Sequence, residues 1–128
     1  SCHTEPLFTN NEFHNNGLTL DPYLNDYGRM RVTNNSEDSL KFKVPTLRNI
    51  QFTSPYMHDG RFETLKAVIT HYNSEITHSS TLSESLKNNL QLTHKEEVDL
   101  LVFLRTLTDT DFLFNKRFSY PFNNQTIP

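Results

Sequence analysis

The sequence is poor in cysteine and glycine, lacks tryptophan and contains no long apolar run. Its 128 residues include one cysteine and three glycines. A single cysteine excludes an internal disulfide framework and a cysteine-rich zinc site within the chain. No stretch approaches the roughly 20 apolar residues that a membrane-spanning helix needs. We therefore expect no membrane span.

An excess of positive charge is also missing. Twelve Lys and Arg residues oppose fifteen Asp and Glu residues, and the formal net charge is -3. Because no basic stripe could follow a phosphate backbone, we expect no nucleic-acid partner. The apolar fraction is 34 %, below the roughly 45–50 % of typical globular chains, a figure that also counts Gly. The length predicts one domain over residues 1–128, whose small core would gain from a buried cofactor.

Turn-forming residues divide the chain into a loop-rich first half and a more helical second half. Asn, Pro, Gly and Asp recur too often in the first sixty residues for long helices. From Thr64 onward, the spacing i, i+3, i+4, i+7 predicts a short amphipathic helix. Its apolar face consists of Leu65, Val68, Ile69 and Tyr72. Residues 74–92 are rich in Ser, Thr and Asn and predict a loop with at most a short helical turn near 83–90.

A second helix is predicted from Thr93 to about Leu107. Thr93 and Glu96 have the spacing of a capping box, in which each side chain bonds to a backbone N–H at the helix start. The helix carries an apolar arc wide enough to be covered on most sides, so we expect it to be the main core helix. The tail from Asp109 to Pro128 has scattered aromatics, which we expect to be tucked against the surface. The expected fold class is mainly α.

The first chemical signal is the pair Cys2-His3. A Cys followed directly by a His is the second half of the C-x-x-C-H motif, in which two thiols attach haem covalently and the His ligates the iron. Taken alone, this pair is a weak signal. It fits equally a free thiol beside a surface histidine.

Two further segments support the interpretation of this pair as part of a haem-attachment motif: KVPTLRNI at 43–50 and TSPYMHDGRF at 53–62. Together with Thr64-Leu65 and the apolar pattern of 92–108, they resemble the C-terminal haem domain of bacterial di-haem cytochrome c peroxidases. The resemblance covers nearly the whole chain and implies a cytochrome c-like domain with long irregular loops. It also implies haem c bound through Cys2 and His3. The chain is then expected to be a piece of a larger di-haem protein that begins inside the motif, and material made without haem-attachment machinery can lack haem.

The residue opposite His3 across the iron is expected to be Tyr72, with Met57 as the runner-up. In the family that this chain resembles, the ligand lies fourteen residues beyond the His of the His-Asp-Gly turn, which here is His58. A Met at that position is typical of the peroxidases. A Tyr resembles the di-haem enzyme that matures methylamine dehydrogenase. The alternative for Tyr72 is an ordinary core tyrosine, and Met57 would favour a plain electron-transfer cytochrome.

Further charged or titratable side chains are candidates for contacts with the haem. His58 could bond a propionate or act in proton transfer, or it could simply hold its turn. Arg48 and Arg61 are candidate propionate partners because a guanidinium matches a carboxylate, with solvated surface charges as the alternative. The remaining polar-segment histidines are expected at the surface: His14, His78 and His94.

The resemblance also implies a calcium ion between the two haems, held in part by backbone carbonyls of Thr53 and Pro55. Calcium prefers such hard oxygen ligands. A further Asn ligand would come from the other haem domain, so the site in this chain would be incomplete.

The resemblance implies a periplasmic protein that reduces hydrogen peroxide with electrons from a small redox protein, either a cytochrome c or a cupredoxin. An N-terminal haem domain of the same protein would be the intramolecular partner, and a homodimer is left open. The isolated domain should then show little turnover. Two alternatives remain: a Tyr-ligated oxidase that acts on a protein substrate, and a plain electron-transfer cytochrome c domain. The sequence does not decide the electron donor or the true substrate.

Overall fold

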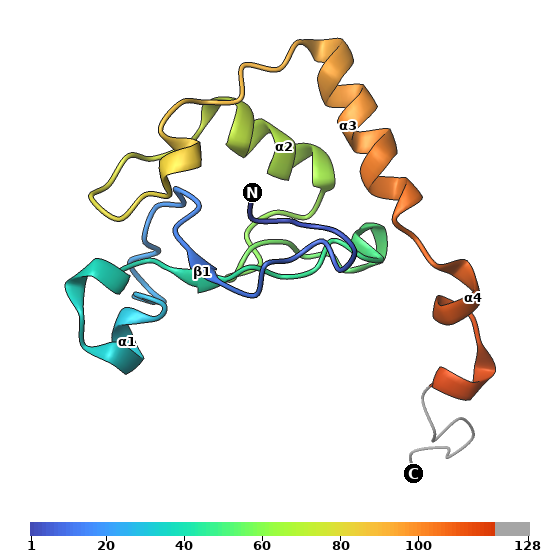
Figure 1. The fold of residues 1–128 in the computed structure, drawn as a ribbon, viewed down its shortest axis with the longest axis horizontal. Helices are drawn as coiled ribbons and strands as arrows, with labels where there is room; N and C mark the ends of the chain where they lie inside the picture. The colour runs from blue at the N-terminus through green and yellow to red at the C-terminus, as the bar shows by residue number, and fades with distance from the viewer. Residues whose placement is uncertain (120–128) are drawn as a thin grey trace.

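A computed structural model describes residues 1–119 and shows four helices and one two-stranded sheet in that part of the chain (Figure 1). The helices are α1 (Met30–Thr33), α2 (Leu65–Ser74), α3 (His94–Thr106) and α4 (Thr110–Leu113). Strands β1 (Phe13–His14) and β2 (Phe42–Lys43) pair antiparallel, with Phe13 opposite Lys43. Single 3-10 turns occur at Ser36–Asp38, Ile50–Phe52, Glu84–Leu86 and Lys116–Phe118. The regular structure is mainly helical, as expected.

The first sixty residues are irregular, which confirms the expectation from their turn-forming composition. Their longest helix, α1, has four residues. Segments far apart in the sequence are instead joined by backbone hydrogen bonds. The N–H of Thr77 donates to the carbonyl of Gly17 at 2.8 Å, and the N–H of Ser83 donates to the carbonyl of Asn15 at 3.2 Å. These bonds fix the loops without regular elements.

Helix α2 begins where the sequence predicts. The Thr64 hydroxyl accepts a hydrogen bond from the N–H of Ala67, which satisfies one of the free donors at the helix start. Leu65 and Ile69 lie on the predicted apolar face and are buried, together with His71. The amphipathic pattern therefore describes this helix correctly.

Helix α3 has the predicted capping box between Thr93 and Glu96. The expectation that its apolar arc is covered on most sides is wrong. Only Leu104 is buried, whereas Val98, Val102 and Phe103 are exposed. Helix α3 packs against α2 and the 3-10 turn at 50–52, and Phe103 also meets the ring of Phe8 edge-on, with centroids 6.5 Å apart.

The main core lies between α2, α3 and the segment that precedes α2. Its buried members are Tyr56, Leu65, Ile69 and Leu104. The Tyr56 hydroxyl donates to the carbonyl of Ile50 at 2.9 Å, so the one polar group of this cluster is satisfied. This core holds the 56–62 turn against α2.

The described part of the tail also departs from the sequence expectation. Residues 109–119 form α4 and the 3-10 turn at 116–118 and extend away from the body in Figure 1. Their aromatic side chains are exposed instead of tucked in: Phe112, Phe114 and Phe118. The rest of the predicted tail, residues 120–128, lies outside the described residues. Within residues 1–119, no helix is long and apolar enough to cross a membrane.

Candidate functional site

The Cys2-His3 pair lies at the start of a closed loop over residues 2–10. The N–H of Asn10 donates to the carbonyl of Cys2 at 2.9 Å, and the Thr4 hydroxyl donates to the carbonyl of Thr9 at 3.3 Å. The N-terminus is placed beside α2 in the middle of the molecule (Figure 1). The two residues of the predicted haem motif therefore belong to a loop whose conformation is held by hydrogen bonds.

His3 is held in an orientation that suits a metal ligand. Its Nδ1 lies 2.9 Å from the carbonyl oxygen of Phe8. Because a carbonyl only accepts, Nδ1 carries a hydrogen, and in the neutral imidazole Nε2 then carries the lone pair. Histidines that ligate metals commonly donate their other ring N–H to such a carbonyl. His3 Nε2 makes no hydrogen bond within residues 1–119 and is available to a metal.

The remaining ligands would have to come from a prosthetic group. No group of three or more His, Cys, Asp and Glu side chains in residues 1–119 could hold a metal ion. A single available imidazole beside a free cysteine, Cys2, is the donor set expected for a metal that already carries an equatorial ligand such as a porphyrin. The residues present therefore fit haem c.

Tyr72, the predicted sixth ligand, lies on α2 and is half-buried. Burial raises the pKa of the Tyr72 phenol, a hydrogen bond with the Asn16 side chain lowers it, and the charge of Cys2 raises it again. The net pKa lies above the ordinary value of 10.0. The ring also meets the ring of His71 edge-on, with centroids 5.2 Å apart.

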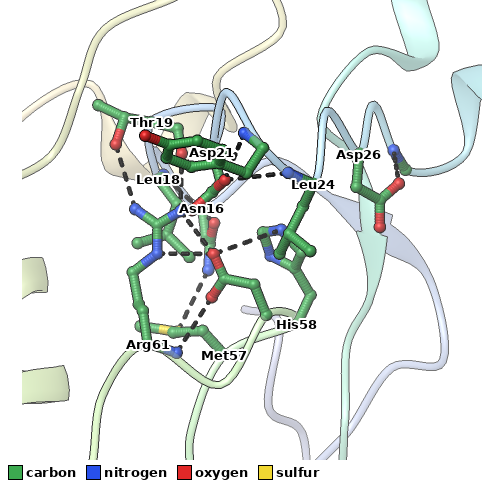
Figure 2. Close-up of polar contacts among 12 residues, drawn as sticks. Asn16, Leu18, Thr19, Asp21, Leu24, Asp26, Met57, His58 and Arg61 are labelled. Atoms are coloured by element: carbon green, nitrogen blue, oxygen red, sulfur yellow. Dashed lines mark hydrogen bonds and ion pairs between the residues drawn. The ribbon is translucent and has the colours of Figure 1, made fainter.

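Met57, the runner-up, points toward Asn16. Its sulfur accepts a hydrogen bond from Asn16 Nδ2 at 3.5 Å, as Figure 2 shows. Met57 has φ 72°, a left-handed conformation that is strained for a residue with a side chain and is held only where the surroundings fix it. The thioether is therefore committed to a neighbour within the protein.

The His-Asp-Gly turn contains Asp59, which pairs with Arg61, and Arg61 also contacts the loop at 16–28. Arg61 Nε donates to Asp59 Oδ2 at 2.7 Å, and Arg61 also donates to the hydroxyl and the carbonyl of Thr19 at 3.1 and 2.9 Å (Figure 2). Burial raises the pKa of Asp59, but the hydrogen bonds and charge of Arg61 outweigh it, so this pKa lies below its usual value. Arg61 is thus committed to the turn.

His58 belongs to the same turn. Its ring stacks on Phe42, with centroids 3.6 Å apart and planes inclined by 12°. Its Nε2 lies 4.0 Å from Asp59 Oδ2, and its side chain is 17 % exposed. Burial lowers the pKa of His58 more than Asp59 and Asp26 raise it. A neutral, stacked imidazole fits a turn-holding role, and it also leaves His58 able to accept a proton.

Arg48 contacts the loop that carries His3. Its Nη2 donates to the carbonyl of Pro6 at 2.9 Å. Arg48 and Phe8 also line a shallow surface pocket of about 280 Å³, together with Asn49 and residues 106–109. Arg48 is therefore next to the proposed haem attachment, whereas Arg61 is bound elsewhere.

The remaining predicted residues lie further from this cluster. Thr53 and Pro55 are exposed, and the Thr53 hydroxyl donates to the carbonyl of Ile50 at 3.2 Å. His78 and His94 are exposed, as expected. The expectation for His14 is wrong, because His14 is half-buried and its Nδ1 lies 3.2 Å from the Ser83 hydroxyl.

Sequence reasoning missed Asn16, whose side chain contacts Met57. The run Asn15-Asn16-Gly17 indicated only a turn. His71 is 2 % exposed, and its Nε2 lies 2.9 Å from the carbonyl of Asn16. These contacts cross 41 and 55 residues of sequence, which no local pattern could reveal.

Comparison with known proteins identifies relatives over most of the chain. No protein-family model matches. The methylamine utilization protein MauG of Methylophilus methylotrophus is 36% identical over 109 residues, 84% of this chain and 31% of the relative. The cytochrome-c peroxidase IdrP1 of Pseudomonas sp. (strain SCT) is 36% identical over 80% of this chain and 27% of the relative. The cytochrome c551 peroxidase of Nitrosomonas europaea is 34% identical over 98% of this chain and 35% of the relative.

A solved structure agrees with these relatives. The crystal structure of a MauG-like protein associated with microbial copper homeostasis superposes with a TM-score of 0.75 and 36% identity, over 94% of this chain and 41% of that chain. The chain spans about a third of the length of the curated relatives that it matches.

Proposed function

The chain belongs to the bacterial di-haem cytochrome c peroxidase family, which includes the MauG proteins, and on this basis we propose that it serves as a haem c-binding electron-transfer domain in a peroxide-reducing enzyme. The observation that carries the proposal is His3, whose Nδ1 is fixed by the carbonyl of Phe8 while Nε2 is left available. When bound, the haem supplies the redox chemistry, and the protein supplies its ligands and electrostatics.

Each nearby side chain has a distinct task in this proposal. Cys2 would supply a thioether sulfur for covalent attachment of the haem, and His3 would supply a nitrogen ligand to its iron. Tyr72 would supply a second iron ligand from α2. Arg48, which already reaches the Cys2-His3 loop through Pro6, would pair with a haem propionate. His58 would accept or return a proton at its turn.

Peroxide turnover in the full-length protein tests the proposal. The protein is produced with a complete C-x-x-C-H motif and a periplasmic haem-attachment system, and oxidation of a reduced small cytochrome c or cupredoxin by hydrogen peroxide is followed. We expect turnover by the full-length protein and little by residues 1–128 alone, because the peroxide-reducing haem would lie in the other domain. Robust turnover by residues 1–128 would contradict this division of labour.

A second candidate function is oxidation of a protein substrate by a Tyr-ligated haem. The observation in its favour is Tyr72, a half-buried phenol on α2 at the position of the predicted sixth ligand. A phenolate is a hard anionic ligand and favours ferric iron, as in catalase. Ferric absorption spectra of the full-length protein should change in Tyr72→Phe and stay unchanged in Met57→Leu. The opposite pattern would mean that Met57 is the iron ligand and that the domain stores electrons.

We also propose a periplasmic location, because covalent haem attachment takes place outside the cytoplasm. A small redox protein would deliver electrons, and the N-terminal haem domain of the same protein would receive them. A calcium ion would bind partly through the carbonyls of Thr53 and Pro55, with the rest of its ligands from that domain. Calcium titration should therefore shift the spectrum of the full-length protein and leave residues 1–128 unchanged.

A further inference from the structure

Asn16 is clamped between α2 and the loop at 76–83. Its carbonyl accepts a hydrogen bond from His71 Nε2 at 2.9 Å. Its neighbour Asn15 is 1 % exposed and donates from Nδ2 to the hydroxyls of Ser79 and Thr81 at 3.0 and 2.9 Å. These contacts fix the backbone at 15–17 independently of the Asn16 side chain.

Gly17 completes this clamp. It has φ +75°, and a Cβ at this position would lie 2.6 Å from Cγ2 of Ile76. Only glycine permits both this conformation and this close approach. The side chain of Asn16 consequently starts from a backbone that cannot shift freely.

The amide of Asn16 is oriented by two contacts. Oδ1 accepts from the N–H of Leu18 at 3.4 Å, which directs Nδ2 toward Met57. Nδ2 donates to the sulfur of Met57 at 3.5 Å (Figure 2). The two polar ends of the amide are therefore both used within the protein.

We propose that Asn16 is a positioning residue that selects the sixth iron ligand, by binding the Met57 sulfur and so keeping it from competing with Tyr72 for the iron. This inference rests on the proposed haem function and on Tyr72 as the ligand. A sulfur lone pair that accepts an N–H bond is withdrawn from competition for a metal. The choice between the two candidate ligands then favours oxygen over sulfur.

The test uses the full-length haem-loaded protein and two substitutions that remove the donor in different ways. Asn16→Ala removes the whole amide. Asn16→Asp keeps an oxygen that accepts from the N–H of Leu18, so the local turn is retained, but its carboxylate cannot donate to sulfur. Asn35→Ala is the matched control, because Asn35 lies in the same loop-rich half and, within residues 1–119, its side chain accepts only from the N–H of Glu37, at an exposed turn outside the site.

The readouts are the ferric absorption spectrum and the midpoint potential, neither of which depends on turnover. We expect no far-red sulfur-to-iron band in the wild type or in Asn35→Ala. Asn16→Ala and Asn16→Asp should each gain this band and shift the potential upward, because a Met ligand raises it. Adding Met57→Leu to either variant should remove the band.

Failure of the inference and failure of the proposed function give different spectra. If both Asn16 variants keep the wild-type spectrum and potential, Asn16 does not select the ligand, although Tyr72 remains one. Loss of haem incorporation in both variants would identify Asn16 as a structural residue and overturn the inference. A sulfur band already present in the wild type and lost in Met57→Leu would overturn Tyr72 as the ligand, and the inference with it.

Discussion

Two regions of the molecule relate regular structure to burial in opposite ways. Around residues 13–18 the chain has only a two-residue strand, yet Asn15, Gly17 and Leu18 are buried. Helix α3 is the longest helix of residues 1–119, yet Leu104 is its single buried residue. Hydrogen bonds between distant loops therefore bury side chains at 15–18, whereas helix formation alone does not bury those of α3.

The difference has a physical cause. A buried polar group must be hydrogen-bonded, so the contacts of Asn15 with Ser79 and Thr81 specify one arrangement of three segments. An exposed apolar side chain specifies nothing, because no partner constrains it. Most of the candidate site therefore lies in the region with less regular structure, where individual hydrogen bonds fix the positions of the side chains.

The largest expected effect is on peroxide turnover and comes from substitution of His3, in the loop-rich region. In the full-length protein, His3→Ala removes the axial nitrogen that the Phe8 carbonyl orients. Changes to residues that merely support a ligand cost about 10–100-fold, so loss of the ligand should lower peroxide turnover by about a hundredfold or more. His94→Ala, at an exposed histidine of α3, should leave turnover unchanged. Full turnover by His3→Ala would show that this loop does not hold the redox centre.

A second pair of substitutions examines the two sides of α3. Leu104→Ala leaves a cavity in the main core and should lower the free energy of unfolding by about 3 kcal/mol. Val102→Ala, on the exposed side of the same helix, should change it by less than about 0.5 kcal/mol. Urea denaturation of the chain measures both. Equal losses would mean that the exposed side is covered by something outside residues 1–119.

A third substitution addresses the buried charge in the His-Asp-Gly turn. Asp59→Asn leaves Arg61 without its carboxylate and should cost about 2 kcal/mol at neutral pH, as expected for hydrogen bonds to charged groups. Because pairing with Arg61 outweighs the effect of burial, the pKa of Asp59 lies below its usual 3.8 in the folded state. Its contribution is therefore complete above about pH 4 and is lost as the pH falls through the lower folded pKa.

Thermal denaturation between pH 7 and pH 2 measures this dependence. The stability of the wild type should fall below about pH 4, and that of Asp59→Asn should fall less steeply there. Glu37→Gln, at an exposed carboxylate, is the control and should follow the wild type. Parallel curves for Asp59→Asn and the wild type would show that the Asp59–Arg61 pair does not stabilise the fold.

The sequence predicted the elements that depend on local chemistry. The start of α2 at Thr64 and the capping box of α3 follow from spacing within one or two turns, and both are present. Burial of α3 was predicted incorrectly, because periodicity identifies an apolar face but does not supply a partner to cover it. The exposure of Phe114 in the tail has the same explanation.

The candidate site was predictable only in part. Cys2, His3 and Tyr72 were identified from motif and resemblance. Asn16 was not found, because its contact with Met57 crosses 41 residues of sequence. Side chains that act through other side chains leave no spacing signal, and only the folded arrangement reveals them.

The smallest expected effect sharpens the comparison at His58, where an aromatic contact replaces a hydrogen bond. Burial against Phe42 lowers the pKa of His58 below its usual 6.5, despite the opposing charges of Asp59 and Asp26. The unfolded chain therefore binds the proton more tightly, and the contribution of His58 is complete above about pH 6.5 and declines as the pH falls. Between pH 8 and pH 5, His58→Gln should remove this decline, which amounts to less than about 1 kcal/mol. Phe42→Leu should weaken the decline, because a smaller neighbour lets water reach the imidazole, and His78→Gln, at an exposed histidine, should leave it intact. If Phe42→Leu keeps the full pH dependence, the stacked ring is not what buries His58, and the turn is fixed by the Asp59–Arg61 pair alone.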